Sequence, residues 1–172
     1  MRNHPDFIPE LDFVAVHGGK IIGNIMYTKS RLIDENGECF PTITFGPISV
    51  LPDHQRKGIG SALIRHSIRK AVSLGQKAII IEGYPHDYCK HGFKCCRDFS
   101  VSDGEGKFPL GLLVLELSEG CLLGHKWKTI LSNVFIMDES KAAEYDESFP
   151  PKKKEYRYSQ EEFRIASHAF VE

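Results

Sequence analysis

Apolar and polar residues alternate along the first fifty positions in a way that predicts three antiparallel strands. Residues 11–16 alternate, the turn at 17–20 follows, and residues 20–28 resume the alternation. A second turn at 34–38 leads into residues 39–50, a long stretch rich in β-branched and aromatic side chains. We therefore expect a hairpin followed by a third neighbouring strand.

The third of these strands changes phase in its middle. Ile43 and Phe45 are apolar at odd positions, whereas Ile48 and Val50 are apolar at even ones. A slip of one residue moves every side chain to the opposite face of a sheet. Because Gly46-Pro47 lies between the two halves, an extra residue there would keep both halves on the same core. The pattern predicts a β-bulge at this dipeptide.

A helix and a buried strand are predicted next. Apolar residues recur every three or four positions over 59–72, and Gly75 fits the left-handed residue that ends a helix. The unbroken apolar run 78–81 suits a strand that is buried on both faces. Strand, helix and strand in succession imply a right-handed crossover and a parallel strand pair.

The remaining chain completes the predicted fold. Residues 84–91 indicate a short helix or turn, and 93–101 and 111–117 two more strands. Beyond residue 120 the pattern weakens into a linker at 149–154 and a terminal helix, for which Ser159 and Glu162 predict a capping box. We expect an α/β (α+β) fold, with a mixed, mostly antiparallel sheet around a parallel β-α-β unit. Its domain covers residues 1–120, and 121–172 form an extension packed on it.

Composition narrows the choice of partners. The 172 residues suffice for one core, and 22 basic side chains are offset by 23 acidic ones. We therefore expect no nucleic-acid and no membrane partner, since either usually requires a basic excess. No segment approaches the roughly 18 apolar residues that span a bilayer, so we expect a cytoplasmic protein with its five cysteines reduced.

The loop Gln55–Ser61 is the strongest candidate for chemistry. A glycine-containing loop that opens a helix gathers unpaired backbone N–H groups and the positive end of the helix dipole, and it therefore binds phosphate. Gly58 and Gly60 have no Cβ to block a ligand. The dinucleotide pattern fails because its third glycine position holds Leu63, and no P-loop is present. In the remaining alternative, the glycines merely shape a turn.

The run Q-R-K-G-I-G-S-A-L from Gln55 resembles the Q/R-x-x-G-x-G/A signature of the GNAT N-acetyltransferases. In that family the signature follows a bulged strand and precedes a helix, a buried parallel strand and a Y-x-K-x-G-F segment, which here stands at 88–93. The resemblance covers about residues 11–118. It implies a splayed strand pair that binds acyl-CoA, and direct transfer of an acetyl group from acetyl-CoA to a primary amine in a ternary complex.

The resemblance also implies the site residues. The backbone of Ile48, Ser49 and Val50 would meet the pantetheine arm of acetyl-CoA. The pyrophosphate would be held by Gln55, Arg56, Lys57, Gly58, Ile59, Gly60 and Ser61. Tyr88 matches the tyrosine to which the family assigns protonation of the leaving thiolate; the alternative is a tyrosine that only packs.

The base and a metal are less sharply indicated. Glu82 ends the buried strand where the gap should open, so it is the first candidate for the general base. The alternative is that Glu82 is an ordinary exposed carboxylate at a strand end. His86 could do the same directly or through water. Cysteine and histidine side chains cluster at Cys89, His91, Cys95 and Cys96, but they lack the paired spacing of structural zinc sites, so we expect no metal.

The chain departs from the family at its start. Members normally begin with a further strand and two helices that wall the acceptor site, but only residues 1–10 precede the first hairpin here. The segment after Ser118 or another subunit could complete the site, or the chain is a shortened form. A free sheet edge also favours a homodimer. The acceptor, a small-molecule amine or a peptide or protein amine, stays open, and the alternative function is a non-catalytic acyl-CoA-binding module or sensor.

Overall fold

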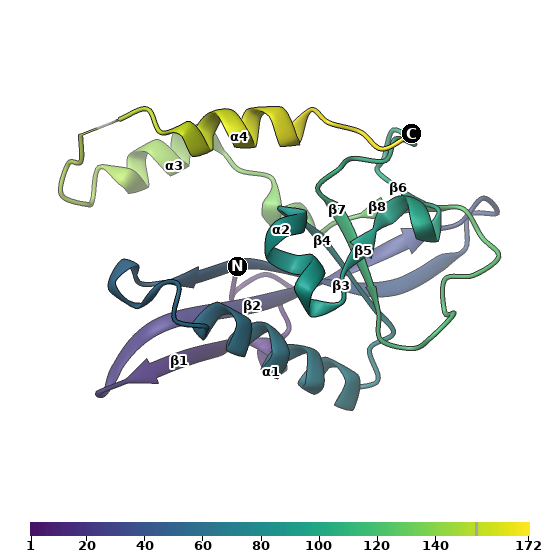
Figure 1. Cartoon of the computed structure of the whole chain (residues 1–172), viewed down its shortest axis with the longest axis horizontal. Coiled ribbons are helices and arrows are strands. Elements are labelled where there is room, and N and C mark those ends of the chain that lie inside the picture. Colours follow the sequence, from purple (N-terminus) through teal and green to yellow (C-terminus); the bar gives the residue numbers. More distant parts are fainter. Residues whose placement is uncertain (154) are drawn as a thin grey trace.

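The computed structural model describes residues 1–153 and 155–172. Within them one mixed sheet runs in the order β5-β7-β4-β3-β2-β8-β6, and β1 pairs with β2 beside this path (Figure 1). The strands are β1 (Phe13–His17), β2 (Lys20–Ile33), β3 (Cys39–Val50), β4 (Ala78–Glu82), β5 (Lys94–Cys95), β6 (Val101–Ser102), β7 (Leu112–Glu116) and β8 (Trp127–Ile130). The α-helices are α1 (Ile59–Ser73), α2 (Pro85–Tyr88), α3 (Glu139–Asp146) and α4 (Tyr158–Ser167).

The predicted fold class is confirmed by the strand pairing. β1, β2 and β3 are successive antiparallel neighbours, and β4 pairs in parallel with β3 after the crossover through α1. β7 then adds to β4 in antiparallel orientation. None of the helices in the described chain is long and apolar enough to cross a membrane.

The predicted bulge in β3 is also confirmed. Ile25 pairs with Ile48 and Tyr27 with Phe45, so Gly46 and Pro47 together oppose a single residue of β2. Phe45 and Ile48 therefore both pack into the same hydrophobic cluster in spite of their different phase. The extra residue in β3 therefore keeps the apolar side chains before and after the bulge on the same core.

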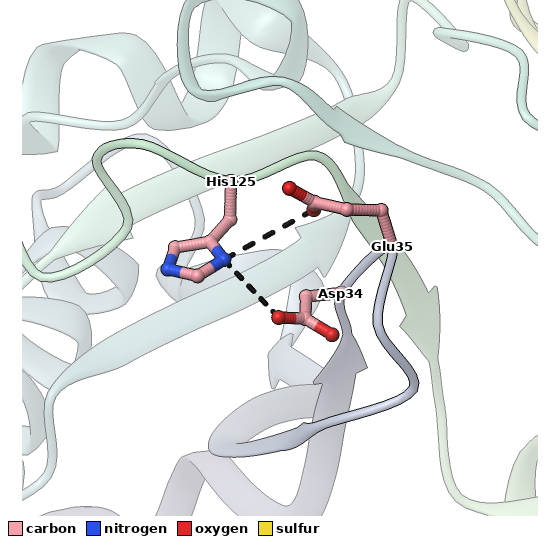
Figure 2. A group of neighbouring side chains, drawn as sticks. All are labelled: Asp34, Glu35 and His125. Carbon is pink, nitrogen blue, oxygen red and sulfur yellow. Dashed lines mark ion pairs between the residues drawn. The ribbon is translucent and has the colours of Figure 1, made fainter.

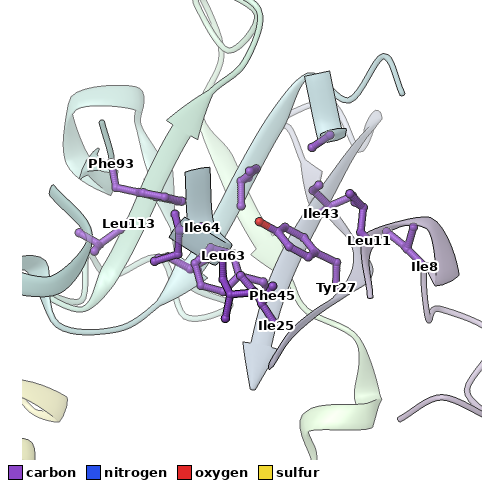
Figure 3. Close-up of a cluster of buried hydrophobic side chains, with 13 residues drawn as sticks. Ile8, Leu11, Ile25, Tyr27, Ile43, Phe45, Leu63, Ile64, Phe93 and Leu113 are labelled. Atoms are coloured by element: carbon purple, nitrogen blue, oxygen red, sulfur yellow. The ribbon is translucent and has the colours of Figure 1, made fainter. Parts of the chain in front are cut away.

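Two hydrophobic clusters cover the two faces of the sheet. The first lies between the sheet and α1, and Figure 3 shows its buried side chains around Tyr27, whose hydroxyl is 2.8 Å from Ser67 Oγ. The second lies on the opposite face and includes Leu32 and Trp127. β4 contributes Ile79 and Ile81 to the first cluster and Ala78 and Ile80 to the second. This strand is therefore buried on both faces, as the unbroken apolar run predicted.

The single strand predicted over residues 93–101 is wrong. Only Lys94–Cys95 pairs with β7, and the chain then turns through a 3-10 helix at Cys96–Phe99. Ser100 adopts the left-handed conformation (φ 54°), which ends the turn and redirects the chain so that β6 pairs with β8. Cys96 is fully buried in the second cluster, so burial of one side chain competes with extension of the strand.

The segment after residue 120 begins inside the sheet. β8 pairs with β2 through Ile130 and Arg31, and α3 follows, neither of which the sequence pattern indicated. α4 begins at Tyr158, and the Gln160 side chain accepts a hydrogen bond from Arg157 N at 2.6 Å. The predicted capping box of Ser159 and Glu162 is therefore wrong. The predicted linker at 149–154 lies between these two helices, and its residue 154 lies outside the described residues.

Candidate functional site

A gap opens in the sheet where β3 leaves β4. In the described structure the two strands share a single register pair, Ile43 with Ile79. Beyond it β3 stays paired with β2 as far as Val50, whereas β4 stays paired with β7 as far as Glu82. The carboxyl ends of two parallel neighbours are thus drawn apart by their other partners.

A cavity of about 630 Å³ lies at this gap on the α1 side. That volume is typical of sites for ligands of cofactor size. Its lining includes every predicted cofactor-binding residue except Lys57, whose ammonium group instead donates to Asp53 O at 2.7 Å. The lining residues are Ile48, Ser49, Val50, His54, Gln55, Arg56, Gly58, Ile59, Gly60, Ser61, Ile64, His86, Asp87, Tyr88, Lys90 and His91.

Backbone N–H groups of the loop before α1 point to an anion site. Arg56 (φ 59°) and Gly58 (φ 82°) both take the left-handed conformation. The first hydrogen bond of the helix runs from Ala62 N to Gly58 O at 2.9 Å, so the N–H groups of residues 59–61 precede the hydrogen-bonded turns. Gln55 Nε2 donates to Val50 O at 2.9 Å and ties this loop to the end of β3. The helix dipole adds to the positive potential here.

Two of the three charged side chains that line the cavity, Arg56 and Lys90 but not Asp87, are basic and favour an anion. Arg56 and Lys90 supply positive charge from two different segments, the loop before α1 and the segment after α2. Burial, and then the charges of Lys90 and Arg65, lower the pKa of His91, so its imidazole is neutral at pH 7. Arg56 and Lys90 therefore carry positive charge at the cavity, whereas His91 does not.

Tyr88, the last residue of α2, also lines the cavity. Its ring packs directly on the backbone of Gly83, where an added Cβ would overlap the ring edge. It also contacts the rings of Phe45 and Phe93, with centroids 5.6 and 6.1 Å away. Burial and then the charge of Asp87 raise the pKa of the Tyr88 phenol. The hydroxyl is therefore protonated at neutral pH and can donate a proton.

Comparisons with known proteins agree with this geometry. The family model described as "Acetyltransferase (GNAT) family" matches residues 3–93. The chain belongs to the GNAT family. It is 31% identical over 113 residues to the uncharacterized N-acetyltransferase YjhQ of Escherichia coli K12, a match that covers 66% of this chain and 59% of that relative. The chain thus spans about three fifths of the relative's length.

Two solved GNAT structures share the fold. One is the N-acetyltransferase YhbS of Escherichia coli in complex with CoA, with TM-score 0.64 and 19% identity, covering 72% of this chain and 68% of that one. The other is a GNAT family acetyltransferase of Brucella melitensis in complex with acetyl-CoA, with TM-score 0.52 and 23% identity, covering 71% and 66%.

The two candidate bases of this GNAT chain lie on different sides of the sheet. Glu82 is exposed at the end of β4 and continues the face of Ala78 and Ile80, opposite α1, so it does not line the cavity. His86 is exposed and does line it. Only His86 of the two candidates therefore lies on the cavity side of the sheet.

Sequence reasoning missed several residues of the site. His54, Ile64, Asp87, Lys90 and His91 also line the cavity. Two of them, Lys90 and His91, fall within the Y-x-K-x-G-F segment, so the motif itself could have indicated them. The packing of the Tyr88 ring on the Gly83 backbone could not be predicted from neighbouring residues, because it depends on how the chain folds back after β4.

Among the described residues, the group with ligand atoms close enough for a metal is Asp34, Glu35 and His125 (Figure 2). Cys89, His91, Cys95 and Cys96, whose spacing argued against a metal, are not among the groups with such close ligand atoms in the described residues. Both carboxylates already accept hydrogen bonds that hold the turn between β2 and β3. Asp34 accepts from the N–H groups of Asn36 and Glu38 at 2.8 Å, and Glu35 accepts from the N–H group of Lys126 at 2.8 Å. The cluster therefore fastens one end of the sheet.

The same loop makes stability depend on pH. Burial opposes ionisation of Asp34, but hydrogen bonds from Glu38 and Asn36 and the nearby His125 outweigh it and lower the carboxyl pKa. Its contribution to stability is thus present above the unfolded pKa of about 3.9 and is lost as pH falls through the folded pKa.

We expect Asp34→Ala to lower the melting temperature at pH 7, with the difference from wild type narrowing below about pH 4. Asp98→Ala, at an exposed aspartate, is the control, and an equal loss at both pH values would contradict this role.

Proposed function

We propose that the protein is an N-acetyltransferase that binds acetyl-CoA in the cavity beside α1 and transfers the acetyl group to a primary amine. The observation that carries this proposal is the coincidence of a phosphate-binding helix start with a gap between parallel strands. Arg56 and the first N–H groups of α1 border the same cavity as Ile48 and Tyr88. The CoA and acetyl-CoA bound by two proteins of the same fold support this choice of cofactor.

The cofactor arm would lie along β3 in the gap. Residues 48–50 keep their ladder with β2, and in the described structure their other edge has left β4. An extended arm bearing amides can pair with such an edge as an added strand does. The carbonyl of Val50 already accepts from Gln55, so the remaining backbone groups of this stretch would serve the arm.

The transfer itself needs three events. The acceptor nitrogen, with a pKa near 10.4 when it resembles lysine, must lose a proton before it can attack. Its lone pair then forms a C–N bond to the thioester carbonyl carbon, the C–S bond breaks, and the electron pair leaves on sulfur. In our proposal Glu82 accepts the proton that the ammonium group loses before attack, and the nitrogen releases its second proton to solvent once the C–N bond has formed. Tyr88 donates a proton to the sulfur, which yields a neutral amide and the CoA thiol. Both residues return to their starting protonation states through solvent.

Gly60 gives the most direct test of the cofactor site. An added Cβ there would meet only Val50 Cγ2, at 3.9 Å, so the fold has room for a side chain at this position of the cavity lining. We expect Gly60→Leu to weaken acetyl-CoA binding at least about tenfold by blocking approach to the helix start, with the melting temperature little changed. Calorimetric titration measures the affinity. Gly104→Leu, at a turn glycine with nothing within 4 Å, is the matched control. Unchanged affinity in Gly60→Leu would overturn the proposal.

Tyr88→Phe removes the proposed proton donor and keeps the ring that packs on Gly83. We expect kcat to fall by about 10²-fold, within the range of general acid catalysis, while the Kd of acetyl-CoA is unchanged. Stopped assays of released CoA thiol measure the rate. Full retention of kcat would show that the tyrosine only packs. If wild type binds acetyl-CoA but releases no thiol with any amine of a panel, the protein is a binding module.

Glu82→Gln separates the two candidate bases. If the carboxylate on the far face of β4 takes the amine proton, this change lowers kcat by about 10²-fold, whereas His86→Gln leaves most of the activity. Glu119→Gln, at another exposed glutamate, controls for loss of surface charge. The opposite ranking of the two variants would assign the base to His86 and to the cofactor side of the gap.

A further inference from the structure

The C-terminal segment crosses the sheet on the side away from the cofactor cavity. We call residues 133–153 and 155–167 the arch. Figure 1 shows its helices α3 and α4 on one side of the strands and α1 on the other. Its start is fastened where Ser132 Oγ donates to Asp6 Oδ2 at 2.7 Å. Its end is fastened by a short ladder, in which Leu110 N donates to Ala169 O and Val171 N to Phe108 O, each at 2.8 Å.

The arch contacts β3 and the short segment that follows β4. On the β3 side, the ring of Phe135 lies over Gly46 in the bulge, where an added Cβ would be 3.4 Å from Phe135 Cε1. On the β4 side, the ring of Phe163 meets Tyr84 edge to face, with centroids 6.5 Å apart. The same short segment after β4 turns Tyr84 toward the arch and Tyr88 toward the cavity. The arch thus bridges β3 and the segment after β4 on the face of the sheet opposite α1.

The side chains on this face of the sheet fit a ligand with a positive charge attached to an apolar body. Phe163 is 62% exposed and Phe135 39% exposed, so each ring keeps free apolar surface. Glu82 lies on this face of β4, and Glu162 of α4 is close enough to raise the pKa of the Tyr84 phenol, after the larger effect of burial. A carboxylate beside exposed aromatic surface attracts an ammonium group and packs the carbon skeleton that carries it.

We propose that the arch is the acceptor-binding wall of the enzyme and that it selects primary amines carried on an aromatic body. The proposal rests on the proposed function. With the cofactor arm filling the α1 side of the gap, an amine reaches the thioester from the other side, where Phe135, Phe163 and Glu82 lie. In this proposal residues 133–153 and 155–167 form that wall.

The test uses two synthetic ligands that need no turnover. In one, the sulfur of CoA is joined through an acetyl bridge to phenethylamine, and in the other through the same bridge to ethanolamine. We expect the phenethylamine conjugate to bind wild type about tenfold more tightly than the ethanolamine conjugate, because it buries a ring against the arch. In Phe163→Ala the preference should fall to about twofold, while the Kd of CoA stays unchanged. Calorimetric titration measures all three ligands.

The controls separate the possible outcomes. Tyr156→Ala removes another exposed aromatic ring of the arch and should keep the preference. Phe135→Ala, checked for an unchanged melting temperature, should reduce the preference as Phe163→Ala does. If wild type binds CoA but treats the two conjugates alike, or if Phe163→Ala keeps the full preference, the arch is not the acceptor wall. If wild type binds neither CoA nor the conjugates, the proposed function fails as well.

Discussion

The site depends on the divergence of β3 from β4. β3 is held along its length by β2, and the bulge at Gly46-Pro47 bends it while keeping Phe45 and Ile48 in one core. β4 is held on its far side by β7 and is buried on both faces, so it cannot follow. The two strands therefore separate after their pair at Ile43 and Ile79. The cavity and the unpaired strand edge both follow from this separation.

The start of α1 is brought to the gap by a short connection. Only residues 51–58 join the end of β3 to the helix, and Gln55 hydrogen-bonds back to Val50. The N–H groups that a helix cannot satisfy by itself therefore face the gap. An anion at such a helix start is stabilised by about 0.3–1 kcal/mol from the dipole, and by more where it is partly buried. Arg56 and Lys90 add charge where a pyrophosphate would lie.

Much of this arrangement is predictable from local patterns. The phase change of β3, the helix spacing and the glycines of the loop are all encoded by neighbouring residues. They predicted the bulge, and the residues that they indicated for the cofactor all line one cavity except Lys57. The contacts made over long distances were not predictable. Nothing near Tyr88 in the sequence indicates that Gly83 supports its ring, and β8 is too short for its period to be recognised around Trp127. The strand predicted over 93–101 failed because burial of Cys96 outweighed its extended pattern.

Hydrogen–deuterium exchange in the presence of CoA tests the central claim most directly. The amides of residues 59–61 precede the first helical hydrogen bond, so they should exchange rapidly in the free protein. Saturating CoA should slow exchange there and along residues 48–50, with little change in the loop at Asp34. Exchange that stays rapid at residues 59–61 while CoA is bound, or protection confined to another surface, would contradict the assignment of this gap as the acyl-CoA site.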